Sequence, residues 1–554
     1  MATVGQTFGS SMDNGLPGAA NATGSQGGLL SAALAGFQQA PIRYTISTLL
    51  ISFIIYLYKQ SIPEIDSKEP PLMLPRIPFI GHLIGLVRNQ SDYYTNLYKK
   101  TGAPIATLPM MGGKTYAIWD PALVQSALRQ KTLSFEPFAI DFLQTMLGMK
   151  EESYSRFREK PEIVVEFFDA LHVTVRGEPL HRMNANALNF ISSRLDAIKG
   201  TGKVQVDNFY LWLRELMTLA TTTALLGDRN PLLLNGKLID DLWTWETALP
   251  NMLVTPWHSV TNADAFQSRE RLQKALGEYY SSRGDLEESV AAVTSARAAV
   301  LRKHGLPDSE IGRFEASLLQ LSVGNTIPTT FWMVANIFTR RELVERLRAE
   351  LEPLARRSGD AVSVNITRFD DVCPLLVSCY REAIRLSSHA LCVRRVMEET
   401  VISDGRGASY VLKKGSDVQI PAGFTHRAED IWGASAAQYD ADRFVNNQSR
   451  LSAQAEKNKR ASYIPFGGGK HLCPGRNFAF AEILGATAAL VLAFDVSSDG
   501  AQAPVWLPDM ATTTIMGGAS KPDKMGEGMS LVMKRRPGWE NVKFEFEVTG
   551  GGQA

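Results

Sequence analysis

The stretch YIPFGGGKHLCPGR, residues 463–476, places one of the chain's four cysteines just after three consecutive glycines. Glycine gives up side-chain packing for access to positive φ angles and for close approach of the backbone to a bulky group. Cys473 precedes Pro474 and the apolar run NFAFAEILGATAALVLAF, so it stands where a helix is predicted to begin. Free N–H groups and the dipole at a helix start stabilise negative charge, which favours a cysteine held as thiolate. A buried, inert thiol is the alternative for this cysteine taken alone.

Charge and cysteine content exclude several classes of function. The 554-residue chain carries 58 Lys and Arg against 57 Asp and Glu, so no nucleic acid or other strongly charged partner is expected. The four cysteines include no C-x-x-C pair and are too few for a disulfide framework, so neither a zinc site nor disulfides are predicted. Gly469-Lys470 lacks the following Ser or Thr of a phosphate-binding loop.

The N-terminus differs in composition from the rest of the chain. Residues 1–43 are rich in Gly, Ala, Ser, Asn and Gln and predict a disordered, lumenal tail. YTISTLLISFIIYLYKQ, residues 44–60, predicts a transmembrane signal-anchor helix. Its uncharged part is short, so a signal-peptide core or a buried helix is the alternative.

Charges and prolines after this helix predict the orientation of the chain. Three basic residues follow it, Lys59, Lys68 and Arg76, against Arg43 alone before it. The positive-inside bias therefore places the remaining bulk of the chain in the cytosol. The prolines in residues 61–80 predict an extended, semi-rigid hinge ahead of a domain over residues 81–554.

Short-range patterns predict a largely helical domain with a few strands. PIATLPMMGGKTYAIWD, residues 104–120, alternates like two strands joined at Gly112-Gly113. A long apolar helix is predicted after Asp308, which would be its N-cap. Pro328 falls inside that helix and predicts a kink or local opening midway, because proline has no backbone N–H. No linker divides the later chain, so one large domain is expected.

The cysteine loop resembles a known motif. FGGGKHLCPGR resembles the haem-binding loop of the cytochrome P-450 family, Phe-x-x-Gly-x-Arg/His-x-Cys-x-Gly. The matching residues are Phe466, Gly469, His471, Cys473 and Gly475. Two further motifs precede the loop in the family's order, Glu382-x-x-Arg385 in CYREAIRLSSHALCVRR and Arg443 in YDADRF. The resemblance implies the family's fold, mainly α with small β-sheets (α+β), as a single large domain behind the N-terminal helix.

The resemblance also implies a cofactor and roles for these residues. Haem b would be bound with Cys473 as the axial thiolate. Glu382, Arg385 and Arg443 would form a buried charge network that braces the haem side of the core. Arg394 and His471 match positions that contact the haem propionates, and most relatives carry Arg at the latter. Phe466 would pack beside the sulfur.

The predicted oxygen-activating helix departs from the family's pattern. An acidic residue followed by threonine is usual, whereas VGNTIPTTFW places Gly324 and Asn325 there. This variant, with RLSSHALCVRR, resembles the branch that contains sterol 7-hydroxylases and prostacyclin synthase. The Asn325 amide, with Thr326, would order a water that delivers protons. The alternative is that Asn325 only satisfies backbone opened by Pro328.

We therefore expect a membrane-anchored haem-thiolate monooxygenase that oxidises a lipophilic sterol, terpenoid or polyketide-type molecule in secondary metabolism. An NADPH-dependent flavin reductase would supply electrons, because the chain shows no flavin or nicotinamide module. The resemblance implies a single-pass endoplasmic reticulum protein with its catalytic domain in the cytosol. Residues 133–142 and 248–258 fall where relatives have pocket and access loops. A reductase-independent isomerase or dehydratase acting on a lipid peroxide is the alternative, and a silent haem- or sterol-binding protein is a third.

Overall fold

A computed structural model describes residues 41–61, 63–75, 80–110, 113–200, 202–445, 452–498, 505–511, 518–524 and 529–548. The predicted disordered tail lies outside these residues, apart from positions 41–43. The chain divides into two compact units, Met1–Pro63 and Glu64–Ala554.

The first unit contains one described helix, α2 (Pro41–Ser61). It extends beyond both ends of the predicted span of residues 44–60. Its 21 residues correspond to about 31 Å, close to the thickness of a bilayer's hydrocarbon core. Apolar side chains along it are exposed, namely Ile42, Ile46, Leu49, Leu50, Ile51, Phe53, Ile55 and Tyr56.

The second unit is mainly helical. Its longer helices are α3 (Leu83–Thr101), α4 (Pro121–Arg129), α5 (Glu136–Thr145), α6 (Glu151–Glu159), α7 (Glu162–Thr174), α8 (Gly177–Asp196), α9 (Phe209–Leu226), α11 (Lys237–Val254), α13 (Ala263–Ser281), α14 (Ala292–Lys303), α15 (Asp308–Val323), α16 (Thr326–Phe338), α17 (Arg341–Leu351), α19 (Pro374–Ser387), α22 (Ala453–Ser462) and α23 (Arg476–Ala493). Among the described residues, α23 is the one helix long and apolar enough to cross a membrane. Its residues lie in the main core, so α23 is a core helix.

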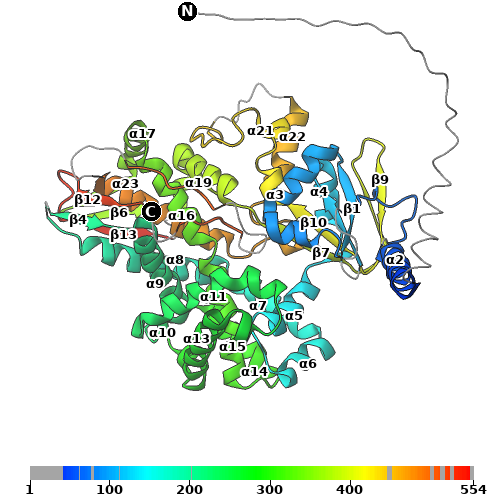
Figure 1. Cartoon of the computed structure of the whole chain (residues 1–554). Helices are drawn as coiled ribbons and strands as arrows, with labels where there is room; N and C mark the ends of the chain where they lie inside the picture. Colours follow the sequence, from blue (N-terminus) through cyan, green and yellow to red (C-terminus); the bar gives the residue numbers. More distant parts are fainter. Residues whose placement is uncertain are drawn as a thin grey trace, which may run out of the picture. The chain divides into compact units, whose positions relative to one another are not determined.

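Small sheets complete the unit. The largest has the order β1-β2-β10-β7-β3, from β1 (Ile105–Met110), β2 (Gly113–Ile118), β10 (Asp417–Pro421), β7 (Leu391–Val396) and β3 (Leu133–Ser134). The predicted hairpin is confirmed, because β1 and β2 pair antiparallel with Ile105 opposite Ile118. In Figure 1, β1, β10 and β7 lie beside α3 and α4, away from α13 and α15.

Three further sets of strands are shorter. They are β11 (Phe494–Ser497), β12 (Leu531–Arg535) and β4 (Lys203–Val206); β13 (Lys543–Glu547), β6 (Ala361–Asn365) and β5 (Ala355–Ser358); and the pair β8 (Thr400–Ser403) and β9 (Ser409–Leu412). Strands of two to six residues beside this many helices confirm the predicted mainly helical class with small sheets.

The proline-rich segment after α2 is bonded to the large sheet. Thr107 N donates to Pro71 O (2.8 Å), and Met73 N donates to Thr107 O (2.9 Å). Leu72 forms a single parallel β-bridge with Thr107, residues 67–69 form a turn, and the buried Glu69 accepts from the Tyr116 hydroxyl at 2.6 Å. Residues 76–79 of the predicted hinge lie outside the described residues. The second unit begins at Glu64, so most of the predicted hinge, residues 61–80, belongs to that unit.

The predicted long helix is interrupted. It forms α15 and α16, with Gly324 and Asn325 between them. Proline clashes with the carbonyl group four residues earlier, and for Pro328 that group belongs to Gly324. The break therefore lies where the proline ring requires it. The prediction of an Asp308 N-cap is wrong: the cap position is Pro307, and the Asp308 carboxylate instead accepts from Arg302 Nε at 2.9 Å.

Candidate functional site

The loop before α23 closes on itself. Cys473 N donates to Phe466 O (3.0 Å), and Gly467 N donates to Ile464 O (3.0 Å). Gly467 and Gly469 have φ angles of 73° and 64°, in the left-handed region that glycine adopts at least cost. These glycines turn the chain so that Cys473 arrives just ahead of the first residues of α23.

The Cys473 thiol lies just before the N-terminus of α23, where the helix dipole and free backbone N–H groups favour negative charge. Burial raises the pKa of the Cys473 thiol, while backbone N–H groups of Gly475 and Arg476 and the Arg476 charge oppose that shift. The upward shift prevails, so the protein alone keeps the thiol protonated at neutral pH. A cation at the sulfur would favour the thiolate, because an opposite charge stabilises the ionised form.

Glu382, Arg385 and Arg443 are brought together. Arg385 donates from Nε and Nη2 to the two Glu382 carboxylate oxygens at 2.7 and 2.8 Å, and Arg443 Nε donates to Oε1 at 2.9 Å. The side chains of Glu382 and Arg385 are fully buried. Arg385 Nη1 also donates to the carbonyl oxygens of His426 (2.5 Å) and Ala436 (2.7 Å). Removal of one partner would cost about 3–5 kcal/mol, because a buried charge would lose its counterion.

Arg394 and His471 also lie close to the glycine-rich loop. Arg394 lies on β7 and donates from Nη2 to Gly468 O at 3.1 Å. His471 Nε2 accepts from Phe135 N at 3.2 Å. Burial lowers the pKa of His471 to about 4, with Arg394 and Lys470 adding to the shift. His471 is therefore neutral at physiological pH, which makes Arg394 the charged member of this pair.

Asn325 and Thr326 lie on a different element. The Asn325 amide oxygen accepts from Ala519 N at 2.9 Å, so this side chain bonds the C-terminal segment rather than the helix backbone next to Pro328. Thr326 is buried at the start of α16. No hydrogen bond or ion pair joins either residue to the cysteine loop among the residues that the structure describes.

The face of α15 that precedes the break is left uncovered. Leu321 is 62% exposed, although its neighbours along α15 are buried. Asn325 follows one turn later and is exposed as well. Leu321 therefore presents an exposed apolar side chain one turn before Asn325. The Cys473 sulfur can ligate iron as a thiolate, and the buried Arg394 can pair with a carboxylate, so these residues fit an anionic iron cofactor such as haem.

Residues 133–142 and 248–258 differ from one another. In the first stretch, residues 135–140 and Phe142 are half-buried, Asp141 is exposed, and most of these residues lie in α5. In the second stretch Leu249 is buried in the core, whereas Leu253, Val254 and Trp257 are 47%, 42% and 80% exposed. An apolar surface is therefore present at the end of α11.

Several residues that support the site were not singled out from the sequence. His426 Nε2 accepts from Ile464 N (3.0 Å) at the entrance to the cysteine loop. Glu246 of α11 and Lys521 form an ion pair beside the α15–α16 break. The sequence indicated an unusual environment for Glu246, because this charged residue falls on the same helix face as the apolar Leu238, Leu242 and Leu249. Nothing near His426 in the sequence indicates its role.

Comparison with known proteins identifies the family. The cytochrome P450 family model matches residues 278–516. A cytochrome P450 monooxygenase of Gibberella zeae is 40% identical over 87% of this chain and 92% of its own length. The human 7-alpha-hydroxycholest-4-en-3-one 12-alpha-hydroxylase is 23% identical over 77% of this chain and 86% of its own length, which agrees with the predicted resemblance to sterol hydroxylases.

A solved structure shares the fold. Retinoic acid bound cyanobacterial CYP120A1 superimposes with a TM-score of 0.61 at 16% identity, and the match covers 84% of this chain and 99% of that one. The predicted fold is confirmed by this match.

Proposed function

The chain belongs to the cytochrome P450 family, and from this membership we propose that it oxidises a sterol-, terpenoid- or polyketide-type molecule of secondary metabolism. The class of enzyme is monooxygenase, and haem held by a cysteine thiolate is the family's cofactor. The observation that carries the proposal is the half-buried Cys473 sulfur, which accepts hydrogen bonds from the backbone N–H groups of Gly475 and Arg476. The name of the human relative, a sterol hydroxylase, supports a lipophilic substrate.

The proposed roles follow from the contacts. Cys473 would hold the haem iron through its sulfur, and haem bound there would supply the redox chemistry that activates O2. Arg394 binds a propionate by charge, and neutral His471 orients the loop by accepting from Phe135 N. Glu382, Arg385 and Arg443 hold α19 against the chain around residues 426–443. Phe466 positions Cys473 through its carbonyl oxygen, and Asn325 with Thr326 orders a water near the helix break.

An anchored location is also proposed. The length of α2 and its exposed apolar side chains suit a single span of the endoplasmic reticulum membrane. The excess of basic residues after it favours a cytosolic catalytic domain. Trp257 and Val260, which are 80% and 79% exposed, would give that domain a second, weaker membrane contact.

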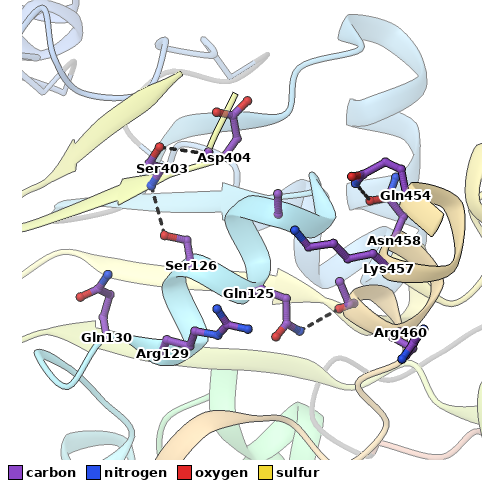
Figure 2. Close-up of a pocket in the computed structure, with 13 residues that line it drawn as sticks. Gln125, Ser126, Arg129, Gln130, Ser403, Asp404, Gln454, Lys457, Asn458 and Arg460 are labelled. Carbon is purple, nitrogen blue, oxygen red and sulfur yellow. Dashed lines mark hydrogen bonds between the residues drawn. The ribbon is translucent and has the colours of Figure 1, made fainter. Parts of the chain in front are cut away.

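A basic surface supports an acidic flavoprotein reductase as electron donor. A pocket of about 550 Å³ lies between α4, α22 and β8, and Figure 2 shows Arg129, Lys457 and Arg460 along it. These three cations have no ion-pair partner among the described residues, and Asp404 is the one carboxylate in the lining. Leu128 of α4 contacts Gly468 of the cysteine loop, so this surface lies one helix away from the sulfur. The double variant Arg129→Glu with Lys457→Glu is expected to slow reductase-supported reduction without changing haem content.

The proposal is tested with full-length protein and reductase, incubated with a panel of sterols, terpenoids and polyketides with and without NADPH. A hydroxylated product that needs NADPH is expected. Product from a lipid peroxide at full rate without NADPH would instead establish the isomerase or dehydratase alternative.

A further inference from the structure

Members of the cytochrome P450 family usually carry an acidic residue in the oxygen-activating helix at the position where this chain has Gly324. The carboxylate of Glu246, from another helix, lies next to this position. A Cβ on Gly324 would lie 2.9 Å from the Gln320 carbonyl oxygen, 3.3 Å from Gln320 Nε2 and 3.4 Å from Glu246 Oε1. Glu246 belongs to α11, which is far from α15 in sequence. The structure thus places a carboxyl group within van der Waals reach of the missing side chain.

The two oxygens of this carboxylate have different surroundings. Glu246 Oε2 pairs with Lys521 Nζ, which also donates to Thr247 Oγ1 at 3.3 Å and lies 5.3 Å from the centroid of the Trp243 ring. Glu246 Oε1, the oxygen next to Gly324, has no hydrogen-bond partner within the described part of the chain. This oxygen is therefore free to accept a hydrogen bond from a water molecule, through which a proton can be transferred.

The segment that carries Lys521 also holds Asn325. Ala519 N donates to the Asn325 amide oxygen at 2.9 Å, two residues before Lys521. Ser520 O accepts from Trp332 Nε1 at 2.6 Å, which fixes this segment against α16. Lys521 is 16% exposed and Glu246 is 2% exposed, so the pair leads from the partly accessible lysine to the buried carboxylate beside the break.

We infer that Glu246, supplied by α11 and held by Lys521, replaces the acid that position 324 lacks and delivers protons to the oxygen-activating site. This inference rests on the proposed monooxygenase function. The overall reaction, RH + O2 + NADPH + H⁺ → ROH + H2O + NADP⁺, consumes two protons and two electrons, and the reductase supplies the electrons. The Lys521 ammonium group passes a proton to the Glu246 carboxylate, and the resulting carboxylic acid passes a proton through Oε1 to the water near Asn325. Neutral Lys521 then takes a proton from solvent, which restores the ammonium–carboxylate pair after each transfer.

The test uses full-length holoprotein with four variants. Glu246→Gln keeps the shape of the side chain but cannot carry a proton in this way. Glu246→Ala removes the group, and Glu246→Ala with Gly324→Asp returns a carboxylate to the position itself. Asp241→Asn is the matched control, because Asp241 lies on the same helix and is buried in an ion pair with Arg271 of α13.

The first readout needs no turnover. The C–O stretching band of carbon monoxide bound to the reduced protein responds to charges that face it, and it is expected to shift in Glu246→Gln but not in Asp241→Asn. The second readout is hydrogen peroxide released per NADPH consumed, which is expected to rise severalfold in Glu246→Gln and Glu246→Ala. Product formation with the best ligand of the panel is expected to fall about 100-fold, the lower end of what acid–base groups contribute. Haem content is expected to stay unchanged in Glu246→Gln. The fall in thermal midpoint from loss of the Lys521 ion pair is expected to be matched in Asp241→Asn, which loses the ion pair with Arg271.

The double variant Glu246→Ala with Gly324→Asp tests whether a carboxylate at position 324 itself can replace the carboxylate of Glu246. At least half of the lost coupling is expected to return in the double variant. An unshifted carbon monoxide band with normal coupling in Glu246→Gln would overturn the inference. A double variant no better than Glu246→Ala, with the thermal midpoint of Glu246→Ala, would overturn it as well. If no lipid in the panel is oxidised, the proposed substrate class fails, while the carbon monoxide band and the peroxide yield still decide the role of Glu246.

Discussion

Gly469 lies directly against the backbone of Leu128: a Cβ on this glycine would be 1.9 Å from the Leu128 carbonyl oxygen. The cysteine loop therefore rests on the last turn of α4 at a separation that only glycine permits. The positive φ angle of 64° at Gly469 adds a second requirement for glycine.

Gly469→Ala is expected to displace the cysteine loop. Gly359→Ala serves as the control, because Gly359 has a similar φ angle of 62° but nothing within 4 Å of its would-be Cβ. In Gly359→Ala, the left-handed backbone conformation alone lowers the free energy of unfolding, by about 1–2 kcal/mol. Gly469→Ala adds overpacking worth about 1–3 kcal/mol. Thermal midpoint and haem content of both full-length variants check this, and equal losses would contradict it.

Cys473→Ala is expected to abolish the absorption band that a thiolate-ligated haem gives with carbon monoxide after reduction. Cys392→Ala is the control, because Cys392 lies on β7 close to Arg394 and its thiol pKa is also raised by burial. The control variant is expected to retain the band. A normal spectrum in Cys473→Ala would show that another residue binds the iron.

His426 is expected to make the protein sensitive to acid. Burial lowers the pKa of His426 to about 3, and the charges of Arg385 and Arg427 act in the same direction. The unfolded chain therefore binds more protons than the folded one below the ordinary histidine pKa. The stability due to neutral His426 is complete above that value and is lost as pH falls toward the folded pKa.

His426→Gln cannot titrate, so its thermal midpoint is expected to fall less between pH 7 and pH 4. The difference in unfolding free energy over this range is about 3 kcal/mol at most. The pKa of His389 is lowered by burial, by Arg427 and by His426, so the pair His389→Gln and His389→Gln with His426→Gln is compared as well, to remove the titration of His389. Parallel pH curves for the two proteins would exclude this role for His426.

Asn325→Ala is expected to lower product per NADPH and to raise peroxide release, because the ordered water loses one of its partners. It also removes the acceptor for Ala519 N, so substrate-binding spectra will shift if that bond shapes the pocket. Asn325→Asp keeps an oxygen acceptor and separates the two effects. Normal coupling in Asn325→Ala, with altered binding spectra, would restrict the residue to holding the C-terminal segment.

Deletion of residues 1–60 is expected to release the protein from tight membrane attachment while haem binding is kept. The physical reason is that α2 belongs to a compact unit separate from the one that carries Cys473. Flotation with phospholipid vesicles measures the attachment. Residual binding is expected to weaken further on Trp257→Ala, since this side chain is 80% exposed. Loss of haem on deletion would show that α2 supports the site.

The sequence alone determined the features that local chemistry dictates. Cys473 before an apolar helix, the glycines ahead of it, and the position of Pro328 each act through groups within a few residues. The β1–β2 hairpin is likewise a short-range feature, because its turn and alternation lie within one stretch. The order of Glu382, Arg385, Arg443 and Cys473 added the family through resemblance, and with it the fold.

Only the tertiary structure decided which distant groups meet. Leu128 sets the space at Gly469, and the carbonyl groups of His426 and Ala436 bind Arg385, from 41 and 51 residues away. The neutral state of His471 depends on burial and on Arg394, neither of which a motif encodes. Glu246 reaches Gly324 because α11 and the C-terminal segment converge there. A pattern in the chain fixes residue type and spacing, whereas contact, burial and charge state depend on how separate elements pack.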